Sequence, residues 1–152
     1  MVRELQELYK FDFFIGSVHH VNTIPIDFSK ELYQQARASV APDASEDHPL
    51  FEAYFDTQYT MLKELRPAVV GHFDLIRLMA TDGGRSDLMA YGDTVWGKVV
   101  RNLEFIKRYN GLIELNSSSM RKGWNTPYPG RDVCRVRPSS LLGAGGGGAD
   151  DE

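Results

Sequence analysis

Residues 68–77 read AVVGHFDLIR, and this stretch decides the fold that we expect. Its first half is apolar and rich in β-branched side chains, which is typical of a buried strand. Three groups able to do chemistry follow at once: the imidazole of His72, the carboxylate of Asp74 and the guanidinium of Arg77. The stretch therefore indicates a buried strand that delivers polar side chains at its carboxyl end.

Two further stretches repeat this plan. Residues 11–20 read FDFFIGSVHH and residues 111–119 read GLIELNSSS, so each is an apolar run that ends in polar side chains. Ser17, His19 and Asn116 are among those polar side chains. Ligands collect at the carboxyl ends of parallel strands, where the strands meet at one edge of a sheet. We therefore expect an α/β fold in which three parallel strands, adjacent in chain order, share a site.

The segments between these strands have the apolar spacing of helices. Residues 50–65 and 93–109 each carry a long apolar stripe, and residues 2–9 and 29–40 indicate shorter helices. Residues 21–28 contain a proline and predict an irregular loop. Four side chains of the two long helices are expected in the core: Leu50, Phe55, Trp96 and Leu103. Strands that alternate with helices, without hairpin signals, favour a parallel sheet or βα barrel with outer helices.

Several polar residues and one glycine mark the expected helix ends. Ser29 and Asp47 precede two of the helices and are suited to cap them. Asp93 or Thr94 is able to cap the helix of residues 93–109. Gly111 stands where a helix C-terminal glycine is usual.

The composition is that of one globular domain. The chain has 152 residues with a net charge of −4, so nothing favours nucleic acid as a partner. No apolar run approaches the roughly 18 residues needed to cross a bilayer, so no membrane partner is expected. Cys134 is the only cysteine, which excludes an internal disulfide and favours the cytoplasm.

We expect a domain over residues 1–134 and a disordered, glycine-rich acidic tail over residues 135–152.

Two histidines are candidate metal ligands. His19 and His72 each follow an expected strand, and neutral imidazole is a common ligand of zinc, manganese and iron. Alternatively, each is a histidine at the border of the core that hydrogen-bonds a carbonyl. His20 should point away from His19 because strand side chains alternate, and His48 is expected to be solvated.

Three cations form a candidate phosphate clamp. Arg77 follows the second expected strand, and Arg121 and Lys122 follow the third, so the three are able to converge on one phosphoryl group. Solvated surface charge is the alternative for each of them. Asp74 is able either to orient a ligand or to pair with Arg77, which is three residues further along the chain, and we expect the pairing.

Three long segments of the chain resemble a known enzyme family. They read IGSVHHVNTIPIDF, LFEAYFDTQYTMLKELRPAVVGHFDLIRL and VWGKVVRNLEFIKRYNGLIELNSSSMRKGWNTPYP. Together they resemble fungal-type histidinol-phosphatases of the polymerase and histidinol phosphatase (PHP) superfamily. The resemblance covers roughly residues 5–134 and keeps the motifs in the family's order.

The resemblance implies both a fold and a reaction. It implies part of a distorted, PHP-type βα barrel and metal-dependent hydrolysis of L-histidinol phosphate, a small phosphorylated substrate of histidine biosynthesis. Up to three divalent metal ions (zinc, manganese or iron) serve the complete fold. His19 and His72 match metal ligands of the family, and no catalytic residue is assigned beyond these ligands. The residues that the resemblance gives as substrate or phosphate contacts are Ser17, Arg77, Asn116, Arg121 and Lys122.

The chain also departs from the family pattern. The family's opening His-x-His strand, its bridging glutamate and its closing Asp-x-His motif have no counterpart in this sequence. We therefore expect a truncated histidinol-phosphatase that is poorly stable and lacks appreciable activity by itself. The alternatives are a non-catalytic fragment that binds phosphate or metal weakly or associates through open sheet edges, and another PHP-type phosphoesterase.

Overall fold

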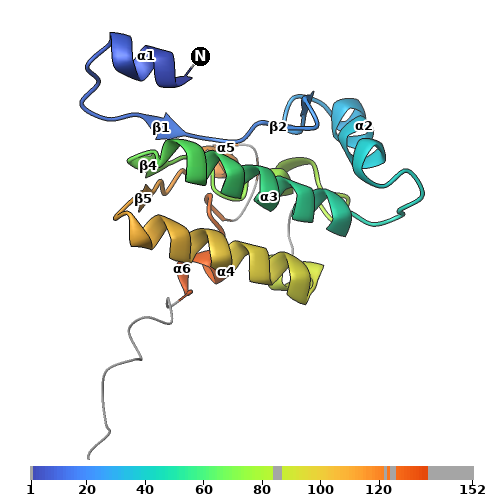
Figure 1. Cartoon of the computed structure of the whole chain (residues 1–152). Helices are drawn as coiled ribbons and strands as arrows, with labels where there is room; N and C mark the ends of the chain where they lie inside the picture. The colour runs from blue at the N-terminus through green and yellow to red at the C-terminus, as the bar shows by residue number, and fades with distance from the viewer. Residues whose placement is uncertain (1, 84–86, 122, 124–125, 137–152) are drawn as a thin grey trace, which may run out of the picture.

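The computed structural model describes residues 2–83, 87–121, 123 and 126–136 (Figure 1). In chain order, the elements are α1 (Val2–Leu8), β1 (Ile15–Gly16), β2 (His20–Val21), β3 (Ile24–Pro25), α2 (Lys30–Val40), α3 (His48–Leu65), β4 (Val69–Val70), the 3-10 helices η1 (Leu75–Met79) and η2 (Leu88–Tyr91), α4 (Asp93–Arg108), β5 (Leu112–Ile113), α5 (Ser118–Arg121) and α6 (Arg131–Cys134). The expected tail lies outside the described residues, except for Arg135 and Val136.

A small parallel sheet organises the molecule. Its strand order is β1-β4-β5, and both pairings are parallel, so the predicted arrangement is confirmed. Ile15 lies opposite Val69, which in turn lies opposite Leu112. Each strand has only two residues, so the first strand is much shorter than the apolar run of residues 11–18 predicts. The protein therefore belongs to the α/β class.

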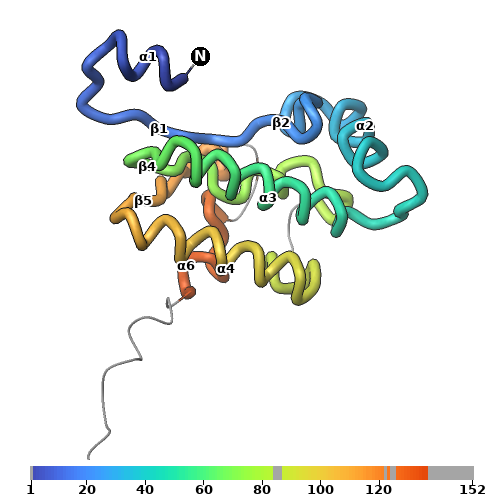
Figure 2. Tube along the Cα trace, viewed as in Figure 1, coloured from blue at the N-terminus to red at the C-terminus, as the bar shows by residue number. Residues whose placement is uncertain are grey.

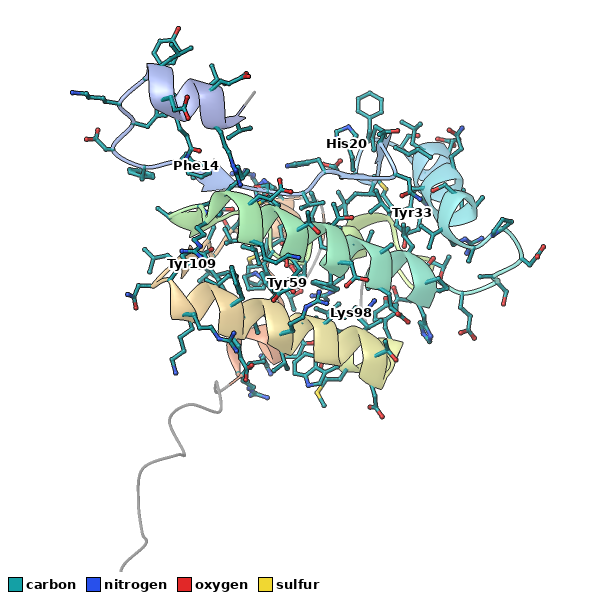
Figure 3. The ribbon with its side chains drawn as sticks, in the orientation of Figure 1. Phe14, His20, Tyr33, Tyr59, Lys98 and Tyr109 are labelled. Carbon is teal, nitrogen blue, oxygen red and sulfur yellow. The ribbon has the colours of Figure 1, made fainter. Side chains whose placement is uncertain are left out.

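The two long helices, α3 and α4, run side by side in the same direction (Figure 2). Leu50 and Phe55 of α3 and Leu103 of α4 are buried, as predicted. Trp96 is only half-buried, so its prediction as a core residue is wrong. It lies at the border of the buried stripe of α4, beside Arg131 and Arg135 of the α6 region. Figure 3 labels Tyr59 of α3 and Lys98 of α4, which lie where the two helices meet.

A hairpin replaces the irregular loop predicted for residues 21–28. Strands β2 and β3 pair antiparallel, with Val21 opposite Ile24. Asn22 and Thr23 form the turn between them, and both have positive φ (48° and 66°), as the tight turns of two-residue hairpins require. Pro25 is compatible with this strand because a two-stranded sheet has only edge strands, which tolerate proline.

Only part of the capping prediction is correct. Ser29 caps α2, because the backbone N–H of Leu32 donates to the Ser29 hydroxyl oxygen over 3.3 Å. Asp47 precedes α3, but its carboxylate does not cap the helix. It accepts hydrogen bonds from the backbone N–H and the hydroxyl of Thr81, over 2.7 and 2.8 Å. This buried carboxylate therefore ties the start of α3 to the segment after η1.

Both ends of α4 also differ from the prediction. Gly92 occupies the N-cap position, so neither Asp93 nor Thr94 is the cap. At the other end, Asn110 rather than Gly111 takes the left-handed conformation, with φ 58°. Gly111 instead donates its N–H to the carbonyl of Ile106 over 3.0 Å, which closes the last turn. Asparagine is the usual substitute for glycine in this conformation.

Two further observations concern the helices. Among the described residues, none of the helices combines the length and apolar character needed to cross a membrane. Helix α1 has no buried residue, although Val2, Leu5 and Leu8 follow helical spacing.

Candidate functional site

The site is built around His72, which only Gly71 separates from the end of β4. Its φ of 49° is unusual for a residue with a side chain and costs about 1–3 kcal/mol, so neighbouring contacts have to hold it. The His72 N–H donates to Glu114 Oε2 over 3.2 Å, and the His72 carbonyl accepts from the N–H of Leu75 over 2.9 Å. The conformation turns the chain out of the sheet immediately after the strand.

A carboxylate orients the His72 ring. Nδ1 of His72 lies 2.9 Å from Glu114 Oε2. An ionised carboxylate only accepts, so Nδ1 carries a hydrogen, and in the neutral form of the ring the lone pair is then on Nε2. The Asn116 amide nitrogen lies 3.2 Å from the same Nδ1, but both atoms carry hydrogens, so no hydrogen bond joins them. The amide donates to Glu114 Oε1 over 3.0 Å instead. This tautomer leaves Nε2 as the ring atom able to bind a metal.

His19 has the same kind of support. Its Nδ1 lies 2.9 Å from Asp27 Oδ2. The rings of His19 and His72 meet edge to face with their centroids 5.7 Å apart. The structure thus brings the two predicted ligands together at the carboxyl ends of β1 and β4. Metal-binding histidines usually have a carboxylate on the second ring nitrogen, so the donor set fits two ligands of a divalent metal.

Gly71 allows the strands to approach closely beside these rings. A Cβ atom at Gly71 would lie 2.6 Å from the Ser17 hydroxyl oxygen and 3.3 Å from Glu114 Oε2. Ser17 and Glu114 therefore converge on the backbone just before His72, as expected for side chains at three adjacent strand ends. Asn116 belongs to the same cluster through its bond to Glu114.

Arg77 lies in a different environment. Its side chain is only 2% exposed, and its Nη1 donates to Asp74 Oδ2 over 2.9 Å. This contact confirms the predicted pairing of Asp74 with Arg77. The Gly130 N–H donates to the same oxygen over 2.8 Å. Burial raises the pKa of Asp74, and the Arg77 guanidinium and the Gly130 N–H oppose this rise. The structure thus places Arg77 in a buried ion pair, whereas a phosphate clamp requires an accessible guanidinium.

Of the other two predicted cations, Arg121 and Lys122, only Arg121 lies among the described residues. Arg121 is exposed at the end of α5, and Lys122 lies outside the described residues. Helix α5 begins just after Asn116, whose side-chain oxygen accepts from the Ser118 N–H over 2.8 Å. The backbone of Asn116 also pairs with Tyr128, whose ring centroid lies 6.2 Å from that of His72.

Sequence reasoning missed Asp27 and Tyr128. Asp27 comes eight residues after His19, and only the β2–β3 hairpin folds it back onto the ring. An Asn-Thr turn is a weak hairpin signal, so the pairing of Asp27 with His19 does not follow from the sequence pattern. Tyr128 reaches the site through a single backbone bridge to Asn116, which has no sequence signature. Burial raises the pKa of Tyr128 to about 12, so its hydroxyl is protonated at neutral pH.

The described residues contain no group of three or more histidine, cysteine, aspartate or glutamate side chains arranged to hold a metal ion. What they provide is a pair of imidazoles, each oriented by a carboxylate, beside a serine hydroxyl and an asparagine amide. Fold and site together define an α/β protein with a polar cluster at the carboxyl ends of parallel strands.

The comparisons with known proteins name the family. Residues 2–118 match the PHP domain, and the chain belongs to this family. It is 43% identical over 129 residues to a probable histidinol-phosphatase of Schizosaccharomyces pombe, a match that covers 85% of this chain and 41% of the relative. It is 34% identical over 154 residues to the histidinol-phosphatase of Saccharomyces cerevisiae, covering 90% of this chain and 44% of the relative. The chain thus spans less than half the length of these relatives.

Proposed function

We propose that this chain acts in the metal-dependent hydrolysis of L-histidinol phosphate to L-histidinol and phosphate. The observation that carries the proposal is the pair of carboxylate-oriented imidazoles, His19 and His72, at the strand ends of a PHP domain. The names of the two fungal relatives supply the substrate. In this proposal the three parallel strands are part of a βα barrel, and the enzyme serves histidine biosynthesis in the cytoplasm.

The residues of this chain have separate roles in the reaction. Nε2 of His19 and Nε2 of His72 would hold a divalent metal (zinc, manganese or iron), and Asp27 and Glu114 fix the two rings. Such a metal would supply Lewis-acid chemistry that activates water toward phosphorus.

Neutral donors beside the histidines are suited to the phosphoryl oxygens. The Ser17 hydroxyl, close to Gly71, and the Asn116 amide lie at the same strand ends. Hydrogen bonds from such donors stabilise the charge that develops on the phosphoryl oxygens in the transition state. The exposed Arg121 is placed to attract the anionic substrate from α5, and Lys122 is its proposed companion. Arg77 has a supporting role here, because its guanidinium is committed to Asp74.

A second candidate function is binding without turnover. Two imidazoles supply fewer than the three protein ligands usual at a catalytic zinc. Within the described residues, no further group completes the set. In this case the chain binds the metal and a phosphate ester weakly and releases no phosphate.

A phosphate-release assay distinguishes the two functions. The 152-residue chain is incubated with L-histidinol phosphate and zinc, manganese or iron, beside the variants His72→Ala and His48→Ala. His48 is half-exposed near Glu46 at the start of α3, so its variant is the control. The proposal expects metal-dependent release, slight in this chain by itself, that His72→Ala abolishes and His48→Ala retains. Metal binding that depends on His72 without any phosphate release supports the second function. Release that is unchanged in His72→Ala contradicts both.

A further inference from the structure

Three polar side chains of α3 and α4 are buried: Tyr54 and Gln58 on α3, and Asn102 on α4. Tyr54 and Asn102 are 0% exposed, and Gln58 is 1% exposed. A buried amide or hydroxyl costs free energy unless it finds a hydrogen-bond partner, so an apolar residue is the simpler choice for a helix interface. The partners of these three side chains show what they stabilise.

All three side chains connect to the backbone that carries His72. Gln58 Nε2 donates to the carbonyl of Phe73 over 2.8 Å. The Tyr54 hydroxyl lies 3.2 Å from the same carbonyl and 3.3 Å from the carbonyl of His72. On the other side, Asn102 Nδ2 donates to Gln58 Oε1 over 3.0 Å. These contacts of Tyr54, Gln58 and Asn102 form a polar chain, a series of hydrogen bonds that runs from α4 through α3 to the segment after β4.

This polar chain acts where the backbone is strained. The left-handed φ of His72 is unfavourable for a residue with a Cβ, and it determines where the imidazole points. The carbonyls of residues 72 and 73 both end in the Tyr54–Gln58 cluster, so the cluster fixes the peptide units that set this turn. The Asn102 amide fixes in turn which end of the Gln58 amide faces Phe73, because a donor must meet Oε1.

We propose that Tyr54, Gln58 and Asn102 are positioning residues that hold the left-handed turn at His72 and thereby aim its imidazole at His19. They contact neither substrate nor metal and act only through the backbone of residues 72 and 73. The use of this alignment to bind metal rests on the proposed function, but the alignment itself does not.

Gln58→Met tests the proposal, with Leu62→Met as the matched control. Methionine preserves the bulk and apolar packing of position 58 but removes the donor to Phe73. Leu62 is also fully buried in α3, one turn further on, and has no part in the polar chain. Two measurements are made on each 152-residue protein. One is the nuclear Overhauser effect between the ring protons of His19 and His72, and the other is the dissociation constant for Zn²⁺ alone.

The expected result is selective. In Gln58→Met the ring-to-ring Overhauser effect falls at least about twofold and the Zn²⁺ dissociation constant rises about tenfold, as for losses of groups that orient metal ligands. Leu62→Met retains both values, and both variants keep the circular dichroism spectrum of the parent. If Gln58→Met does not fold, Tyr54→Phe, which removes one hydroxyl, is judged by the same two measurements.

Three results overturn the proposal. The first is a folded Gln58→Met or Tyr54→Phe protein with an unchanged Overhauser effect. The second is an equal loss in Leu62→Met. The third is failure of both Gln58→Met and Tyr54→Phe to fold, which assigns the polar chain to stability alone. If the parent shows the Overhauser effect but no Zn²⁺ binding, the proposed function fails, while the change in the Overhauser effect still decides the role of Gln58.

Discussion

Gly71 is the single residue on which the spacing of the site depends most. It lies between the end of β4 and His72, and the space that a side chain would need is occupied by Ser17 and Glu114. Its φ is not positive, so the requirement for glycine is one of space and not of backbone conformation. Steric exclusion at this position keeps the side chains of three strand ends within reach of one another.

Gly71→Ala is expected to destabilise the protein by about 1–3 kcal/mol, because forcing an additional carbon into a packed region displaces its neighbours. The free energy of unfolding in urea measures this loss. Gly97→Ala is the matched control, since nothing lies within 4 Å of a Cβ at this helical glycine. There alanine should stabilise the protein by about 0.5–1 kcal/mol through its higher helix propensity. Equal effects of the same sign at the two positions, or a neutral Gly71→Ala, would contradict the steric account.

The sequence predicts which residues gather at the candidate site, but it does not predict the contacts that hold them in place. His19, His72, Ser17 and Asn116 follow apolar runs, and strand topology alone brings them to one edge. The supporting contacts depend on details that periodicity does not encode. Arg77 illustrates this: its position after β4 suggests an exposed clamp, but the turn into η1 buries it against Asp74.

Among the elements, α3 ends with a residue under strain. Arg66 is exposed and has φ 45°, in the left-handed region that favours glycine. Its N–H closes the helix on the carbonyl of Leu62 over 3.1 Å. The helix end thus has the geometry of a glycine cap with an arginine in its place.

Arg66→Gly is therefore expected to stabilise the protein by about 0.5–1 kcal/mol. Relief of the left-handed conformation, about 1–2 kcal/mol, exceeds the entropy that glycine loses on folding. Arg66→Ala keeps the Cβ and should give no such gain. Thermal and urea unfolding of the three proteins provide the measurement, and an equal or greater stability of Arg66→Ala would exclude backbone strain as the cause.

A charged cluster links α3 to α4 on their outer side. Asp56 accepts from Lys98 over 2.6 Å and from Arg101 over 2.9 Å, and Lys98 also lies 3.1 Å from Glu52. Figure 3 labels Lys98 in this region. Burial disfavours the charged form of Asp56, but the hydrogen bonds from Lys98 and Arg101 outweigh it and lower the pKa of this carboxyl.

This lowered pKa predicts a pH dependence of stability. A carboxyl whose pKa falls on folding contributes stability above its unfolded pKa, about 3.9 for aspartate, and the contribution is lost as pH decreases through the folded pKa. The urea midpoint should therefore decrease less between pH 5 and pH 3 in Asp56→Asn than in the parent. Asp43→Asn, in the exposed loop before α3, is the control and should follow the parent. Half of Asp56 is exposed, so added salt should reduce the difference.

The elements that the sequence predicts well are those with a long apolar period. Helices α3 and α4 follow because their stripes extend over several turns, and the parallel strand order follows from the alternation of strands and helices. The β2–β3 hairpin and the 3-10 helices η1 and η2 have too few residues for a period to be recognised. Trp96 shows the remaining error, because the apolar stripe does not fix how far burial extends at its border.

For the whole molecule, both outer strands of the sheet, β1 and β5, have one neighbour each within the described residues. Ile15 on β1 and Leu112 on β5 are 56% and 66% exposed. Beside β5, an apolar groove of about 660 Å³ is lined in part by Leu103, Ile113 and Val133. Exposed strand edges with apolar side chains promote association between chains.

We therefore expect the 152-residue chain to associate as its concentration rises through the micromolar range. Ile15→Lys should shift this association to higher concentration, because a charge on an edge strand opposes edge-to-edge pairing. Met89→Lys adds the same charge at an exposed position in η2, away from the sheet, and is the control. Sedimentation velocity at several concentrations measures the effect. Equal shifts in the two variants would show that net charge, and not the strand edge, governs association.

The sheet register also has a consequence for how the protein folds. Ile15 pairs with Val69, and the hairpin and helices α2 and α3 lie between them; Val69 then pairs with Leu112 across α4. Each pairing closes a long loop, which costs conformational entropy. Only two residues per strand then pair to offset this cost. Local helices are therefore expected to form in microseconds, and the sheet, with the site at its edge, to assemble in a later and slower step. The geometry of the candidate site is thus among the last features that the chain acquires as it folds.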